Sequence, residues 1–157
     1  MAIRRIVTDA DGFLRKKSKH VDKIDARTLK LIDDMRDTLA KHNGVGLAAV
    51  QVGILKRIFI VNTGDETIEL INPEILSAEG EQEDLEGCLS IPGKWGITHR
   101  PMKVTVRAED RNGEVKTYSG EGLVARAFCH ENDHLDGKLY IDIATSMLTQ
   151  EEVDALD

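Results

Sequence analysis

Apolar residues recur at helical spacing in an early stretch of the chain, from residue 25 to residue 42. The apolar positions there are Ala26, Leu29, Ile32, Met35, Leu39 and Ala40. Asp25 precedes them as a suitable N-cap, and Asn43-Gly44 follows them as a stop signal. The pattern therefore predicts an amphipathic N-terminal helix over residues 25–42.

Apolar runs and alternating patterns predict strands in the middle of the chain. "RIFIVN" (57–62) and "TIELINPEIL" (67–76) have this character, with "TGDE" as the turn between them. In "KVTVRAEDRNGEVKTYSG" (103–120), Asn112-Gly113 separates two alternating runs, which predicts a hairpin. The run "GVGLAAVQVG" (44–53) is rich in glycine and small residues, and it predicts a loop or broken turn where the backbone comes close to another group.

Helical spacing returns from Glu121 to about Leu135, and Gly137 follows as a C-terminal stop. The order of helix, strands and helix, with hairpin-type connections, predicts an α+β fold and not a repeating βαβ unit. The 157 residues fit one domain spanning residues 1–157, with no internal repeat or linker.

Composition narrows the range of functions. With 41% apolar and 31% charged residues, the chain has the balance of a soluble globular protein, so its function is expected to come from a folded site. The net charge is −7 and no basic stripe is present, so direct binding of nucleic acid is not expected.

No apolar segment resembles a signal peptide or is long enough to span a membrane, and the expected location is the cytoplasm. The two cysteines, Cys88 and Cys129, are too few for a disulfide framework.

The stretch "CHENDH" (129–134) carries the most specific chemical signal. On a helix, His130 and His134 lie one turn apart on one face, where two imidazoles can hold one metal ion. Glu131 is offset around the helix, and a carboxylate there can take a proton from a metal-bound water, as in the HExxH pattern. Shuffling this composition produces the pattern in about one chain in a hundred, so the motif alone does not establish a metal site.

A catalytic site of this kind needs a third protein ligand and an open position. No third histidine follows at the metzincin spacing, so the ligand must come from elsewhere: Cys88, Cys129, a carboxylate, or one of His20, His42 and His99. Cys129 points about 100° away from His130 on the helix, and a small core residue is the preferred interpretation for it. Cys88 lies in "EGCLSIPG", where glycine and proline indicate an exposed turn at a strand edge from which a thiolate could meet the helix. The three other histidines are given no role.

Three stretches together resemble the motifs of the bacterial peptide deformylases. They are "GVGLAAVQ" (44–51), "EGCLS" (86–90) and "HENDH" (130–134), in the order and at the separations of that family. The likeness extends from "MAIRRIV" to about "IDI", nearly the whole chain. It implies mostly antiparallel sheets packed around a central metal-binding helix. It also implies removal of the formyl group from N-formylmethionyl peptides emerging from the ribosome, with release of formate.

The resemblance also implies roles for particular residues. Cys88, His130 and His134 would hold one divalent metal ion, Fe(II) in the cell, with Ni(II), Co(II) or Zn(II) able to replace it. Glu131 would be the general base and then the general acid, while the Gln51 amide and the Leu89 backbone N–H would stabilise the oxyanion. The expected substrate-binding residues are Val45, Gly46, Glu86, Leu123 and Ala127. Glu86 and Arg100 could also form an ion pair that braces "GCLS", with Asp133 orienting a ligand; ordinary surface charges are the alternative for these three.

Three other functions remain open at this stage. A metallopeptidase could use the same ligands and would cut peptide bonds in place of formyl groups. A structural zinc module would need a fourth protein ligand, which the position of Cys129 disfavours. A relative that binds formyl-peptides without turnover is disfavoured because Gln51, Cys88, His130, Glu131 and His134 are all present.

Overall fold

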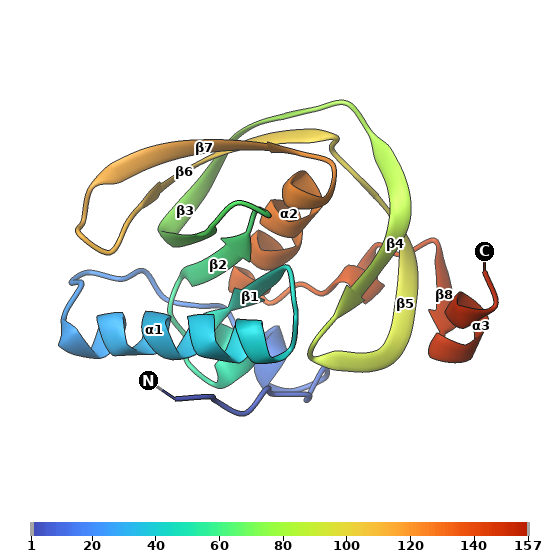
Figure 1. Ribbon diagram of the computed structural model, residues 1–157, viewed down its shortest axis with the longest axis horizontal. Helices are drawn as coiled ribbons and strands as arrows, with labels where there is room; N and C mark the ends of the chain where they lie inside the picture. The colour runs from blue at the N-terminus through green and yellow to red at the C-terminus, as the bar shows by residue number, and fades with distance from the viewer. Residues whose placement is uncertain (1, 157) are drawn as a thin grey trace.

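The computed structural model describes residues 2–156 and has two antiparallel sheets around one central helix (Figure 1). The α+β architecture expected from the sequence is confirmed. Met1 and Asp157, the ends of the expected 1–157 domain, lie outside the described residues. Within residues 2–156, no helix combines the length and the apolar character needed to cross a membrane. The elements in chain order are α1 (Ala26–Lys41), β1 (Gly46–Ala48), β2 (Ile58–Asn62), β3 (Thr67–Glu79), β4 (Gln82–Cys88), β5 (Ile91–Arg100), β6 (Lys103–Glu109), β7 (Val115–Glu121), α2 (Leu123–Leu135), β8 (Ser146–Thr149) and α3 (Gln150–Asp154).

The larger sheet has five strands in the order β1-β2-β3-β6-β7, all antiparallel. Its strand β2 is buried on both faces. Phe59 and Val61 pack in the cluster that includes α2, whereas Ile58 and Ile60 pack in the cluster formed with α1. Successive side chains of a strand point to opposite faces, so one apolar strand contributes to both layers.

Helix α1 forms where the sequence pattern predicts it. The Asp25 carboxylate accepts a hydrogen bond from the Thr28 backbone N–H at 2.9 Å and caps the first turn. Ile32, Met35 and Leu39 are buried against the sheet. The helix therefore covers the face of the sheet opposite α2 (Figure 1).

Helix α2 and the hairpin of β6 and β7 are also confirmed. Asn112 and Gly113 lie in the turn, where the Asp110 carboxylate accepts hydrogen bonds from the backbone N–H groups of Asn112 and Glu114. Helix α2 packs against β1, β2, β6 and β7 on one side and approaches β5 on the other. It lies between the two sheets (Figure 1), and its His130 and Asp133 contact Glu86 of β4 and Arg100 of β5.

The structure corrects the prediction for residues 44–53. The segment predicted as a loop contains strand β1, which pairs with β2, followed by a short 3-10 helix over Ala49–Val52. Local composition favoured a loop because glycine and alanine have low strand propensity, but pairing with the apolar strand β2 decides the outcome. β1 remains the terminal strand of its sheet, so its other edge is not paired within that sheet.

The second sheet, with the order β4-β5-β8, had no sequence prediction. Its strand β4 runs through the acidic stretch 79–87, and β8 and α3 lie beyond the predicted C-terminal helix. Cys88 is the last residue of β4 and is half-buried, so the expected exposed turn begins only at Leu89. β4 is a terminal strand like β1, and residues of both terminal strands line one pocket.

Candidate active site

Three potential metal ligands converge between α2 and the end of β4. His130 and His134 lie one turn apart on α2, with ring centroids 5.0 Å apart. The Cys88 Sγ lies 3.4 Å from His134 Nε2, and the ligating atoms of the three residues all lie within 4.8 Å of one another. The described residues contain no other such group of His, Cys, Asp and Glu. One sulfur and two imidazole nitrogens form a donor set that suits a divalent transition metal.

Glu131 lies beside these ligands and is almost completely buried, with 3% of its surface exposed. Its Oε1 has no hydrogen-bond partner among the described residues. Burial penalises the charged form and raises the pKa of Glu131 to about 7. The carboxyl group can therefore gain and lose a proton near neutral pH, which general acid–base catalysis requires.

The ion pair expected between Glu86 and Arg100 is present. Arg100 Nη2 lies 2.7 Å from Glu86 Oε2, and Arg100 Nη1 lies 2.7 Å from Asp133 Oδ2. Glu86 Oε2 is also 2.5 Å from His130 Nδ1. Because His130 Nδ1 faces this carboxylate, its Nε2 is the nitrogen left to face Cys88 and His134.

The electrostatics follow from burial and from these contacts. Burial alone would raise the pKa of Glu86, but the hydrogen bonds from His130 and Arg100 outweigh it and hold the pKa well below its usual range. Burial lowers the pKa of His134 well below its usual value. At His130 the neighbouring Glu131, Cys88 and Glu86 outweigh burial and raise the pKa. Acidic groups and the Cys88 thiol therefore lie next to His130, although Arg100 and Arg126 pair with Glu86 on its other side.

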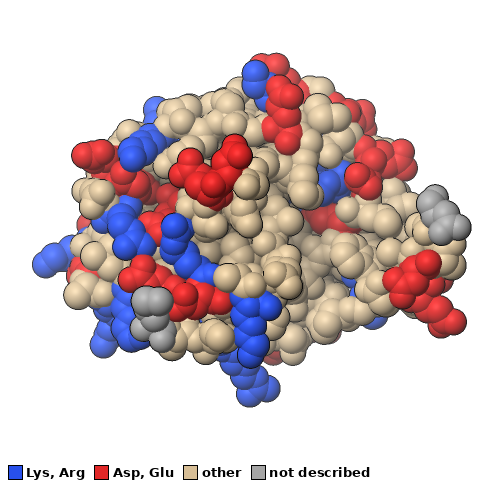
Figure 2. Space-filling model, in the orientation of Figure 1, with Lys and Arg blue, Asp and Glu red and all other residues tan. Residues whose placement is uncertain are grey.

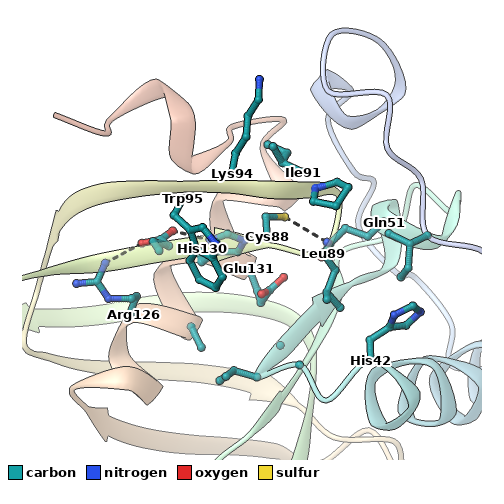
Figure 3. Close-up of a pocket in the computed structure, with 18 of the residues that line it drawn as sticks. His42, Gln51, Cys88, Leu89, Ile91, Lys94, Trp95, Arg126, His130 and Glu131 are labelled. Atoms are coloured by element: carbon teal, nitrogen blue, oxygen red, sulfur yellow. Dashed lines mark hydrogen bonds and ion pairs between the residues drawn. The ribbon is translucent and has the colours of Figure 1, made fainter. Parts of the chain in front are cut away.

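Gln51 approaches the same place from the short helix after β1. Its Nε2 lies 3.5 Å from Cys88 Sγ and 3.1 Å from Ser90 Oγ, while its Oε1 accepts a hydrogen bond from the Ala48 backbone N–H at 3.0 Å. This contact fixes the amide so that its N–H groups point toward Cys88 (Figure 3). Leu89 follows Cys88 in the turn between β4 and β5.

A pocket of about 670 Å³ opens next to the candidate metal ligands. Val45 and Gly46 lie on one wall, and Leu123 and Ala127 of α2 on another. Ala127 is buried, but Leu123 is 61% exposed, so Leu123 lies at the rim and not in the depth of the pocket. Figure 2 shows a mainly uncharged area in the middle of this face, with Lys, Arg, Asp and Glu side chains on both sides of it.

Several residues of the site were not identified from the sequence. Arg126 and Thr98 contact Glu86, Trp95 lines the pocket, and the Tyr140 ring stacks on His130 with a centroid separation of 6.0 Å. A signal for Arg126 was available: it lies four residues before His130, in an otherwise apolar part of α2. Thr98, Trp95 and Tyr140 carry no comparable local signal.

The remaining cysteine and histidines lie elsewhere or at the margin. Cys129 is buried in the main apolar cluster and is not in the group of potential ligands, as the core interpretation expected. Burial raises the pKa of its thiol. His20 and His99 lie on the surface beside Asp22 and Glu81, whereas His42 lies at the edge of the pocket.

The arrangement agrees with a comparison to known families. The family model described as polypeptide deformylase matches residues 3–150. The chain belongs to the polypeptide deformylase family. A peptide deformylase of Caldicellulosiruptor bescii is 52% identical over 154 residues, which cover 98% of this chain and 93% of that protein. Peptide deformylases are enzymes, so the chain is placed among hydrolytic enzymes and not among structural metal modules.

Solved structures of deformylases have the same fold. The peptide deformylase from Legionella pneumophila superimposes with a TM-score of 0.89 at 42% identity, covering 98% of this chain and 92% of that one. The enzyme from Thermotoga maritima gives a TM-score of 0.89 at 39% identity, with coverage of 93% and 100%. Both the two-sheet architecture and the central helix therefore belong to the family.

Proposed function

We propose that this protein removes the N-formyl group from N-formylmethionyl peptides, releasing formate, with one divalent metal ion as cofactor. The observation that carries the proposal is the convergence of Cys88, His130 and His134 beside the buried carboxylate of Glu131. Membership in the polypeptide deformylase family supports the same reaction.

The donor set fits the metal. Cys88 Sγ and the Nε2 atoms of His130 and His134 supply three ligands, which leaves a fourth position open for a reactant. A divalent ion held there would supply a hydroxide nucleophile near neutral pH and would polarise the formyl oxygen. We propose Fe(II) as the metal in the cell, with Ni(II), Co(II) or Zn(II) as substitutes. An iron–thiolate site of this kind is expected to be sensitive to oxygen and peroxide.

Glu131 moves the proton in this proposal. Its unpartnered Oε1 is positioned to accept a proton from the attacking water and then to give it to the departing amine. A carboxyl group whose pKa is raised toward neutrality can do both in one turnover. The amide N–H of Gln51 and the backbone N–H of Leu89 donate to the oxygen on which negative charge develops.

The substrate is proposed to bind as an extended chain between two strand edges. β1 and β4 are terminal strands of different sheets, and each contributes residues to the pocket, so a peptide can pair with backbone there. Gly46 offers its backbone at the β1 edge and leaves room for Glu131, while Val45, Leu123 and Ala127 form apolar surface for methionine. Glu86, expected to contact substrate, already has protein partners at both carboxylate oxygens, so we propose that it orients His130 instead.

The proposed substrates emerge from the ribosome, so we propose that the protein acts in the cytoplasm. It is expected to reach them without direct nucleic-acid binding or a membrane.

Formate release tests the proposal. Protein purified without oxygen is loaded with Fe(II), Ni(II) or Co(II), and formate is measured with formyl-Met-Ala as substrate. Acetyl-Met-Ala is the control, and free alanine is measured in parallel because a metallopeptidase would cut the Met–Ala bond and leave formyl-methionine and alanine. Release of formate without free alanine supports deformylation. Release of alanine without formate would favour the metallopeptidase, and binding without either product would favour a non-catalytic receptor.

A further inference from the structure

Arg126 is a buried arginine that lines the pocket and contacts Glu86, the carboxylate beside His130. Its side chain is 5% exposed, and it extends from α2 one turn before His130. Its Nη1 lies 3.0 Å from Glu86 Oε1 and also donates to Thr98 Oγ1, while its Nη2 lies 3.4 Å from Gln82 Oε1. Figure 3 shows the guanidinium directed toward a carboxylate, on the far side of His130 from Gln51.

The two carboxylate oxygens of Glu86 have different partners. Oε1 accepts from Thr98 Oγ1 at 2.7 Å, Arg100 Nε at 3.1 Å and Arg126 Nη1 at 3.0 Å. Oε2 accepts from Arg100 Nη2 and faces His130 Nδ1. Arg126 and Thr98 thus hold Oε1, and this fixes the direction in which Oε2 points, toward His130.

The charges of this cluster balance. Glu86 and Asp133 are acidic, Arg100 and Arg126 are basic, and a metal-binding His130 is neutral. Removing one partner from a buried group of this kind leaves an uncompensated charge, which the remaining groups can relieve only by moving. Without Arg126, Glu86 would be drawn toward Arg100 and away from its present position beside His130.

We propose that Arg126 is a positioning residue for the metal centre. Together with Arg100 it fixes the Glu86 carboxylate so that Oε2 orients the His130 ring and its Nε2 faces the metal. The inference rests on the proposed metal site. The same side chain lines the pocket, so the substrate pocket and the metal site share a residue.

Metal retention tests this role independently of turnover. Parent protein, Arg126→Met and Arg126→Lys are loaded with Co(II), and the visible absorption spectrum and the rate of Co(II) loss to EDTA are recorded. Arg126→Met keeps a long apolar stem beside the pocket but removes the charge and the donors. Arg57→Met is the matched control, because Arg57 bonds to the Leu135 carbonyl and to Asp136 at the end of the same helix, away from Glu86.

We expect Arg126→Met to lose Co(II) at least about tenfold faster than the parent and to have an altered spectrum. An effect of this size is typical when the residue that orients a metal ligand is removed. Arg126→Lys should release Co(II) at a rate between those of the parent and Arg126→Met, since lysine keeps the charge but not the forked donors of arginine. Arg57→Met should lower the melting temperature while keeping the parent's spectrum and release rate.

Two results would overturn the inference. One is a folded Arg126→Met that keeps the parent's spectrum and release rate. The other is a faster loss in Arg57→Met as large as in Arg126→Met, which would indicate general destabilisation. If Arg126→Met does not fold, Arg126→Lys decides by the same criteria. Failure of the parent itself to bind one Co(II) per chain would instead refute the proposed metal site.

Discussion

The carboxylate of Glu131 lies directly against the backbone of Gly46, in the space that a side chain at position 46 would occupy. A Cβ placed on Gly46 would lie 2.7 Å from Glu131 Oε2 and 2.9 Å from its Cγ. The backbone of Gly46 does not have a positive φ, so the glycine is needed here for space and not for a left-handed conformation. Gly46 in the glycine-rich run before Gln51 therefore leaves the space that the candidate general base occupies.

Gly46→Ala is expected to move Glu131 and reduce kcat by about tenfold or more, because a displacement of the order of 1 Å is costly in a site that transfers protons. Metal content should stay at the parent level, since the three atoms nearest to a Cβ at position 46 all belong to Glu131 and none to Cys88, His130 or His134. Steady-state kinetics with metal analysis of the same samples measures both. A variant with unchanged kcat and a raised KM would show that Gly46 matters only for peptide binding.

Glu131→Gln preserves the shape of the side chain but removes its ability to accept a proton. If Glu131 is the general base, turnover per metal-loaded site should fall by roughly 10² or more, with metal content and folding intact. Formate release normalised to bound metal is the measurement, because an empty site would imitate a catalytic defect. Loss of the metal in this variant would instead identify Glu131 as a ligand, and parent-level turnover would refute the proposed mechanism.

The sequence could predict the elements whose signals are local. The Asp25 cap and the spacing of apolar residues locate α1, the Asn112-Gly113 turn locates the β6–β7 hairpin, and the spacing of His130 and His134 puts both on one face of α2. In each case the deciding interactions are between residues near in sequence, so the pattern alone contains them.

The elements that sequence reasoning missed depend on distant partners. β4 is an acidic segment, and it becomes a strand because it pairs with β5 along nearly its whole length. The roles of Arg126 and Thr98 also depend on pairing, since Glu86 faces both from another element. The Glu86 carboxylate of β4 is contacted by residues of β5 and α2, and contacts between such distant segments produce no periodic pattern in the sequence.

The two cysteines offer a direct test of the ligand set. Cys88→Ala removes the sulfur that lies 3.4 Å from His134 Nε2, so we expect loss of the metal or of its catalytic competence. Cys129→Ala removes a buried core sulfur and should leave most metal and activity in place, at a small cost in stability. Metal content per chain and formate release measure the two effects. The reverse pattern would require a different ligand set.

The apolar pocket predicts discrimination at the first residue of the substrate. Ala127 is buried and Val45 packs against the main apolar cluster, so a carboxylate entering there would lose its hydration without gaining a partner. Formyl-Asp-Ala is expected to have a kcat/KM at least about tenfold below that of formyl-Met-Ala. Formyl-norleucine-Ala is the matched control, since it keeps the length and apolar character of methionine. Equal rates for the aspartate and methionine substrates would refute the pocket assignment.

Asp34 of α1 forms hydrogen bonds and an ion pair with the N-terminal segment. Its carboxylate accepts hydrogen bonds from the Ala2 backbone N–H at 2.9 Å and from Arg4 Nε at 3.0 Å, and Lys30 Nζ lies 3.2 Å away. Only 2% of its side chain is exposed. Burial alone would raise its pKa, but the hydrogen bonds from Lys30, Arg4 and Ala2 outweigh burial and lower the pKa below the ordinary value of 3.8.

This lowered pKa makes part of the stability depend on pH. The native state binds the proton of Asp34 less readily than the unfolded state, so the stabilisation is complete above the ordinary pKa and disappears as the pH falls through the lowered one. Asp34→Asn should therefore lower the free energy of unfolding by about 1–2 kcal/mol at pH 7, the scale of charge-assisted hydrogen bonds. The difference between parent and variant should shrink as the pH falls from about 5 toward 2. Urea unfolding at several pH values, with both proteins at equal metal loading, measures it. A difference that stays constant across this range would mean that the charge of Asp34 contributes nothing.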